Sequence, residues 1–178
     1  MKNNIALIGF MGTGKSAAGQ ALAKKLGWQF IEVDAVIEHA TGKSIPDIFR
    51  EDGEIAFRVQ EIEAIKQISQ GKKQVIACGG GVVLNTININ RLRETGVLVL
   101  LTASPGKILK RTARNRESRP LLANIDDPVL RIKELLKFRK PYYDRAADFV
   151  INTTNTDIDE IVTQIIDRLK EDAGFSFT

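Results

Sequence analysis

The 178-residue sequence has few of the residues that define several large protein classes. Its one cysteine, Cys78, cannot form a disulfide within the chain, so a disulfide-built fold is excluded and nothing indicates an oxidising compartment. Its longest apolar runs are far shorter than the ~20 residues that cross a bilayer, and no signal-like pattern precedes Ile5. We therefore expect a cytoplasmic protein that does not use a membrane as a partner.

Aromatic residues are also scarce, at 6% of the chain with one Trp and two Tyr, which leaves few platforms for stacking nucleic-acid bases. The formal net charge is +4, but the basic residues gather between Lys107 and Arg145, where twelve Lys and Arg stand against five Asp and Glu. A local cationic segment suits a compact polyanion better than a long phosphate backbone. We therefore expect no nucleic-acid partner.

The sequence does have a regular alternation of short apolar runs and longer amphipathic stretches. Runs over 5–10, 29–33, 74–77, 97–101 and 148–151 predict strands, and patterns over 15–26, 53–70, 87–95 and 157–170 predict helices. Alternation of this kind is typical of a parallel sheet covered by helices. The prediction is a three-layer α/β fold with a five-stranded parallel sheet flanked by helices, in a single domain over 1–178.

One segment, from about 111 to 127, departs from this alternation. It is polar and rich in arginine, and Pro120 interrupts it. Such a segment suits a mobile lid over a binding site better than an element of the core. Within it, Arg116 either assists phosphate binding or keeps the lid soluble.

The most specific motif follows the first predicted strand. Residues 9–16 are GFMGTGKS, which matches G-x-x-x-x-G-K-[ST], and a predicted helix comes directly after. In such a P-loop, backbone N–H groups surround phosphate oxygens, Lys15 neutralises the β- and γ-phosphates, and the Ser16 hydroxyl ligates Mg²⁺ directly. The motif predicts a P-loop NTPase fold. The nucleotide-binding residues would be Gly12, Thr13, Gly14, Lys15, Ser16 and Ala17.

Carboxylates that could complete this site follow the second predicted strand. Many P-loop proteins hold the water shell of Mg²⁺ with an Asp at a strand end, but the third strand here ends in Cys78 and three glycines. Glu32 and Asp34 are two residues apart, so on a strand they project to one face. One would hold a water on Mg²⁺, and the other would accept a proton from a substrate hydroxyl. The alternative is that Asp34 only caps a helix over 35–40.

The motifs taken together resemble those of the shikimate kinase family. Besides the P-loop and the acidic pair, the matching features are Phe57-Arg58, the glycines at 79–81, RPLL at 119–122 and RKPYY at 139–143, in order from about Ile5 to Arg168. The resemblance implies a nucleoside-monophosphate-kinase-like fold with a substrate-binding region over about 34–60. It also implies ATP-dependent phosphorylation of the shikimate 3-hydroxyl, with Mg²⁺ as cofactor, in aromatic amino-acid biosynthesis.

The resemblance also implies roles for individual residues. Asp34 would bind the reacting hydroxyl and act as its base, while Arg58 and Arg139 would hold the shikimate carboxylate. Arg119 would reach the nucleotide phosphates from the lid, and Arg111 would lie on the adenine. The remaining substrate-binding positions would be Gly79, Gly80 and Gly81, and the residues implied to be catalytic are Lys15, Asp34 and Arg119.

Two departures from the family pattern are visible. Glu32 stands where the family usually has Asp; it keeps the charge and adds one methylene, so a contact with Mg²⁺ through water is retained with altered geometry. The segment between Arg111 and Arg119 is also about one residue longer than expected.

Two other functions fit part of the pattern. A different small-molecule kinase, of the gluconate- or nucleotide-kinase kind, would need another clamp for its acceptor. A nucleotide-binding module without turnover would not need Lys15, Ser16 and Asp34 together. Taken alone, Arg58 would be a charged residue on a solvated helix face, and Arg139, among other basic residues, would be part of a charged surface. We expect a monomeric shikimate kinase.

Overall fold

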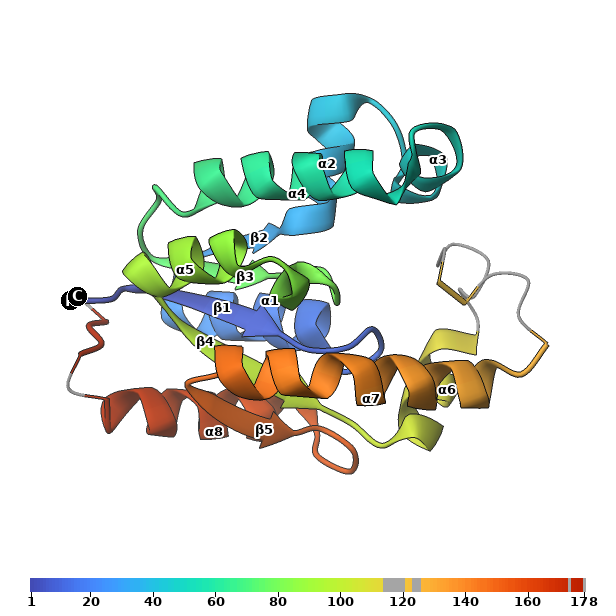
Figure 1. Cartoon of the computed structure of the whole chain (residues 1–178). Helices are drawn as coiled ribbons and strands as arrows, with labels where there is room; N and C mark the ends of the chain where they lie inside the picture. The colour runs from blue at the N-terminus through green and yellow to red at the C-terminus, as the bar shows by residue number, and fades with distance from the viewer. Residues whose placement is uncertain (114–120, 123–125, 173, 178) are drawn as a thin grey trace.

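A computed structural model describes residues 1–113, 121–122, 126–172 and 174–177. Within them, five strands form one parallel sheet in the order β2-β3-β1-β4-β5 (Figure 1). The strands are β1 (Asn4–Ile8), β2 (Gln29–Glu32), β3 (Gln74–Ala77), β4 (Gly96–Thr102) and β5 (Phe149–Asn152). The predicted α/β fold with a five-stranded parallel sheet is therefore confirmed.

Helices cover both faces of the sheet, as Figure 1 shows. Ile5 and Leu7 of β1 face α1 (Lys15–Leu26) and α8 (Ile158–Lys170). Ala6 and Ile8 face the opposite way, into a second apolar cluster built from the other helices. The helices of this cluster are α2 (Val33–Thr41), α3 (Ile45–Glu51), α4 (Gly53–Ile68), α5 (Thr86–Thr95) and α7 (Pro128–Ala146). Because both faces are covered, the central strand is apolar along its length, with only Asn4 polar.

Within the described residues, α2 was anticipated only as the alternative helix over 35–40, and three further helices lie outside the predicted set. They are α3 (Ile45–Glu51), α6 (Pro105–Thr112) and α7, and a single 3₁₀ turn covers Val82–Leu84. Ser44 caps α3 and Ser104 caps α6, and each of these helices has a proline in its first turn. This pairing of a polar cap with an early proline is a helix-start signal. α7 continues through Pro141, which lies inside the helix.

The strand prediction over 29–33 was wrong at its end. β2 stops at Glu32 and α2 begins at Val33, so Asp34 lies in the first turn of a helix. Glu32 and Asp34 therefore do not share the face of a strand. Asp34 is not the helix cap either, because the N-cap position belongs to Glu32. A carboxylate in the first turn of a helix is favoured by the positive end of the helix dipole.

Lys2 and residues 174–176 lie side by side, at the end of the sheet where the strands begin (Figure 1). The Lys2 amide donates to the Gly174 carbonyl, and the Ser176 amide donates to the Lys2 carbonyl. The Trp28 ring packs against Phe175 and Phe177. Within the described residues, no helix is both long enough and apolar enough to cross a membrane.

Candidate functional site

Glycines shape the loop after β1, and residues with a side chain would not fit well at these positions. Gly9, Gly12 and Gly14 have φ angles of 143°, 75° and 95°. A Cβ on Gly9 would lie 2.3 Å from the Leu101 carbonyl oxygen, so the loop passes directly against the end of β4. Gly14 is the N-cap of α1 and Lys15 is its first residue. The predicted P-loop geometry, a tight turn that opens a helix, is thus present.

This loop borders a hollow of about 380 Å³, which we call the loop cavity. The Lys15 ammonium donates to the carbonyl oxygens of Gly9 and Phe10 at 2.8 and 2.9 Å. The Ser16 hydroxyl donates to the Glu32 carboxylate. The two residues predicted to hold Mg²⁺ therefore meet in one place. The cavity is lined on this side by Gly12, Gly14, Lys15, Ser16, Ala17 and Glu32.

Arg111, at the end of α6, closes the loop cavity on the side of β5. Its guanidinium donates to the Gly12 carbonyl at 3.1 Å and to the Thr153 carbonyl at 2.9 Å. The buried Thr153 hydroxyl donates in turn to the Thr13 carbonyl at 2.8 Å. Arg111 and Ala17 also line a neighbouring hollow, together with Thr13, which does not line the loop cavity, and residues 156–159. Thr153, which the sequence did not single out, ties three parts of the site together.

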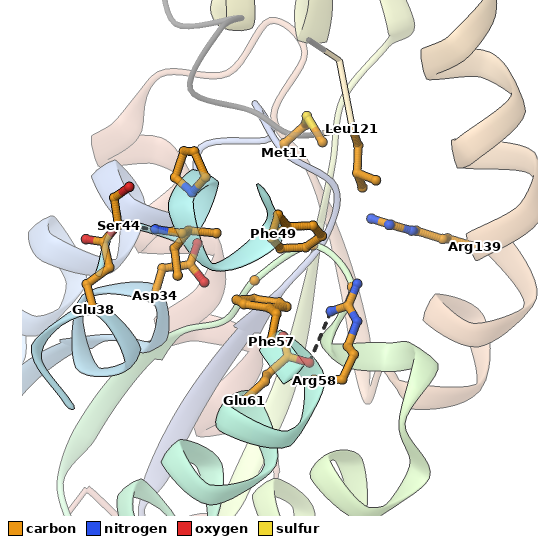
Figure 2. Close-up of a pocket in the computed structure, with 15 residues that line it drawn as sticks. Met11, Asp34, Glu38, Ser44, Phe49, Phe57, Arg58, Glu61, Leu121 and Arg139 are labelled. Carbon is orange, nitrogen blue, oxygen red and sulfur yellow. Dashed lines mark hydrogen bonds and ion pairs between the residues drawn. The ribbon is translucent and has the colours of Figure 1, made fainter. Parts of the chain in front are cut away.

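A second hollow, which we call the arginine cavity, has a volume of about 580 Å³. Figure 2 shows Arg58 and Arg139 extending into it from α4 and α7. Two residues that lie far apart in the sequence thus converge on one space. Apolar side chains form much of the remaining wall: Met11, Ile45, Pro46, Phe49, Phe57 and Leu121.

The Arg58 guanidinium is held by carboxylates of its own helix. It donates to Glu54 at 2.9 Å and to Glu61 at 3.2 Å, and it lies 5.1 Å from the centre of the Phe57 ring. Glu54 is exposed, whereas the Glu61 side chain has no exposed surface. One partner of Arg58 can therefore be replaced easily by a ligand, and the other cannot.

Arg139 is buried, with 3% of its surface exposed. Its guanidinium lies 5.7 Å from the centre of the Phe10 ring, and its Nε makes no hydrogen bond with any described residue. A buried guanidinium with an unused donor is costly unless an anion completes its shell. The arginine cavity is where such an anion would lie.

The three glycines between β3 and the 3₁₀ turn make room for the charged side chains. A Cβ on Gly81 would lie 2.5 Å from two nitrogens of Arg58, and one on Gly80 would lie 3.4 Å from Arg139 Nη1. A Cβ on Gly79 would lie 3.2 Å from oxygens of both Asp34 and Glu61. The Tyr143 hydroxyl donates to the Gly80 carbonyl. Burial raises the pKa of Tyr143 to about 12, so it keeps the proton that it donates.

Asp34 stands where the two cavities meet. It lines both the loop cavity and the arginine cavity, together with Met11, Gly79 and Gly80. Figure 2 shows its carboxylate on the opposite side of the arginine cavity from Arg139. A molecule held by the two arginines would therefore face Asp34 where the arginine cavity meets the loop cavity.

Glu61 is a charged residue of the site that the sequence analysis missed. Burial raises its pKa to about 7; Arg58 opposes this shift and the nearby Asp34 adds to it. The available signal was its position, because Phe57, Glu61, Ala64, Ile65 and Ile68 follow the spacing of one buried helix face. An acid on that face is exceptional and usually has a partner.

Three residues of the predicted lid, Arg116, Arg119 and Pro120, lie outside the described residues. Leu122, inside the segment predicted as a polar lid, is buried against Phe10 in an apolar cluster with α6 and α7. Cys78 is buried, and burial raises the pKa of its thiol far above the usual range.

Comparison with known proteins agrees with this geometry. The family model described as shikimate kinase matches residues 11–170. The shikimate kinase of Thermodesulfovibrio yellowstonii is 50% identical over 163 residues, which cover 92% of each chain. That of Caldanaerobacter subterraneus is 45% identical over 163 residues, covering 92% of this chain and 94% of the relative.

A solved structure gives the same result. The shikimate kinase from Acinetobacter baumannii in complex with shikimate superposes with a TM-score of 0.91 at 34% identity, covering 96% of this chain and 94% of that one. Since the family match spans nearly the whole sequence and both cavities lie within it, the chain belongs to the shikimate kinase family.

Proposed function

We propose that this protein transfers the terminal phosphoryl group of ATP to the 3-hydroxyl of shikimate, giving ADP and shikimate 3-phosphate. The observation that carries the proposal is the shared wall between the two cavities. Asp34 and Gly79 line both of them, so an acid in the arginine cavity and a triphosphate in the loop cavity would meet beside Asp34. In-line transfer requires this arrangement of acceptor and donor.

The acid would be held by its carboxylate. Arg58 and Arg139 offer planar forks of N–H donors, which match a carboxylate better than lysine does. Arg139 would use the charge that it already buries, and Arg58 would exchange the exposed Glu54 for the substrate. Gly80 and Gly81 leave space for the ring against both guanidinium groups.

Asp34 would act on the reacting hydroxyl. Its carboxylate would orient the hydroxyl oxygen towards the γ-phosphorus and accept its proton as the new O–P bond forms. The bond between the γ-phosphorus and the bridging oxygen breaks, and ADP leaves with that electron pair. Gly79 carries no side chain that would separate Asp34 from the acid.

Negative charge on the transferring group must be offset. Lys15 would move from the loop carbonyls to the phosphate oxygens, and Arg119 is proposed from the family resemblance to reach them as well. The Ser16 hydroxyl and the Glu32 carboxylate, already in contact, fit a small oxygen-binding cation such as Mg²⁺. When bound, Mg²⁺ would neutralise charge on the phosphates; Ser16 would hold it directly and Glu32 through water.

A coupled assay of ADP release tests this function. Purified protein with ATP and a divalent cation is expected to release ADP only when shikimate is added. Release only with another acceptor, such as gluconate or a nucleoside monophosphate, would favour a different small-molecule kinase. ATP binding without any turnover would favour a nucleotide-binding module.

The proposal also includes the domain organisation, the oligomeric state and the cellular location. We infer one kinase domain over 1–178 with a lid over about 111–127, acting as a monomer in the cytoplasm. Sedimentation of the purified protein, with and without ATP and shikimate, tests the monomer. A sedimenting species of twice the 19.7 kDa chain mass would contradict it.

A further inference from the structure

Asn88 is a polar residue on the buried side of α5, outside the two cavities. Its side chain has no exposed surface, and its neighbours on that side of the helix are Ile89 and Leu92. Its Oδ1 makes no hydrogen bond with any described residue. An apolar side chain would fit this position at lower cost, because an unsatisfied buried amide oxygen is destabilising. Packing alone therefore does not explain the residue.

The amide nitrogen of Asn88 contacts Glu61, a residue that lines the arginine cavity. It lies 3.5 Å from Glu61 Oε2, the same oxygen that accepts from Arg58 at 3.2 Å. Both residues of this contact are fully buried, so water cannot compete for the carboxylate. Glu61 Oε1 makes no hydrogen bond with any described residue. Asn88 is thus a neutral donor to an acid that otherwise depends on Arg58.

That dependence matters when a ligand enters the arginine cavity. A carboxylate that binds Arg58 draws the guanidinium towards itself and weakens its bond to Glu61. A second donor on Glu61 Oε2 then favours the ionised form of Glu61 and holds the carboxylate in place. We propose that Asn88 is a positioning residue for the arginine cavity: it supports Glu61, and Glu61 orients Arg58 towards the acid substrate. The kinetic consequence of this proposal rests on the proposed function.

In addition to the neutral Asn88 side chain, several charged or titratable groups face Glu61. Arg58 is on its own helix, Asp34 is on α2, and Arg139 and Tyr143 are on α7. The Cys78 thiol at the end of β3 is protonated and adds no charge. Replacing Asn88 leaves all of these groups in place. A change in the titration of Glu61 can therefore be assigned to the loss of one donor.

The test compares Asn88→Leu, which keeps the branched side-chain outline and removes the donor, with Asn90→Leu on the exposed side of the same helix. Asn88→Leu is expected to raise the KM for shikimate roughly 3- to 10-fold with little change in kcat, the weight of one buried hydrogen bond. In a Glu61→Gln background the same replacement should have no further effect on KM. An equal rise in that background would overturn the proposal, because Asn88 would then act independently of Glu61.

A second measurement needs no substrate. The Glu61 carboxyl is titrated by ¹³C NMR in the ligand-free protein, and its pKa is expected to rise in Asn88→Leu because the ionised form loses a donor. Asn88→Asp, which has the same shape, is expected to raise it further and serves if the leucine variant does not fold. An unchanged titration would overturn the proposal even if shikimate turnover is normal. If shikimate turnover is absent from the wild type, the proposed function fails, and this titration still decides whether Asn88 supports Glu61.

Discussion

Arg58 has both ends of its guanidinium occupied before any substrate arrives. Glu61 is buried and permanent, whereas Glu54 is half exposed and competes with a ligand for the same nitrogen. Glu54→Gln should therefore lower the KM for shikimate, by roughly 2- to 5-fold for an exposed ion pair worth under about 1 kcal/mol. Steady-state kinetics against Glu63→Gln, an exposed acid on the same helix, measures the effect. A higher KM in Glu54→Gln would mean that Glu54 helps to hold the substrate.

Asp34 is the residue whose loss should separate binding from turnover. Asp34→Asn keeps the shape of the side chain but removes the proton acceptor, so kcat should fall ~10²-fold or more. Affinity for ATP, measured by calorimetry, should stay close to that of the wild type, because the nucleotide is held by the P-loop. Near-normal turnover would exclude Asp34 as the base.

Gly81 tests whether the glycine run serves the arginines. Its φ of −99° suits any residue, so Gly81→Ala does not strain the backbone. The new methyl group would displace the Arg58 guanidinium, which lies 2.5 Å from its position. We expect the KM for shikimate to rise at least 10-fold while the melting temperature stays close to that of Gly106→Ala, a glycine of α6 with open space around it. A normal KM would show that Arg58 binds no substrate.

The role of a residue could be predicted when a local sequence motif determines it, and not when contacts with residues distant in sequence determine it. The P-loop follows from a local pattern, and Lys15 and Ser16 lie where that pattern places them. Asp34 and Arg58 needed the joint order of several motifs, because each alone has an ordinary explanation. Glu61 and Thr153 depend on neighbours that are distant in sequence, and their local patterns are those of a charged helix and a polar strand end.

The meeting of β5, α6 and the P-loop depends on the Thr153 side chain. Its hydroxyl accepts from Arg111 and donates to the Thr13 carbonyl, at 3.1 and 2.8 Å. Thr153→Val has the same shape, removes one acceptor of Arg111 and takes the donor from the Thr13 carbonyl, so we expect a loss of about 1–3 kcal/mol in the free energy of unfolding. The KM for ATP should also rise, since Arg111 lines the loop cavity. Thr163→Val on the exposed face of α8 is the matched control, and equal values for both variants would contradict the role of Thr153.

Whole helices were predicted unevenly for physical reasons. α1 and α8 carry regular apolar stripes and end near glycine or charged residues, so their limits were close to those observed. α7 was missed because Lys and Arg fill its exposed side and Pro141 interrupts the sequence pattern. Proline ordinarily breaks a helix by removing a hydrogen bond. Here the packing of Ile132, Leu135 and Tyr143 holds the helix across that position.

The stability of the whole protein should depend on pH through Glu61. Its pKa is raised from 4.5 to about 7 on folding, so the folded protein binds a proton that the unfolded chain has lost. The free energy of unfolding should therefore fall as pH rises from about 4.5 to 7, by on the order of 3 kcal/mol from this group. Denaturant unfolding across this range should show the wild type losing stability relative to Glu61→Gln as pH rises. A constant difference would mean that Glu61 does not titrate there.

The pairing of Lys2 with residues 174–176 lies at the end of the sheet where the strands begin, opposite the P-loop. A solid support or a fluorescent label attached at this end of the sheet would leave the loop cavity and the arginine cavity open. A protein immobilised or labelled at this end would therefore keep both cavities accessible to their ligands.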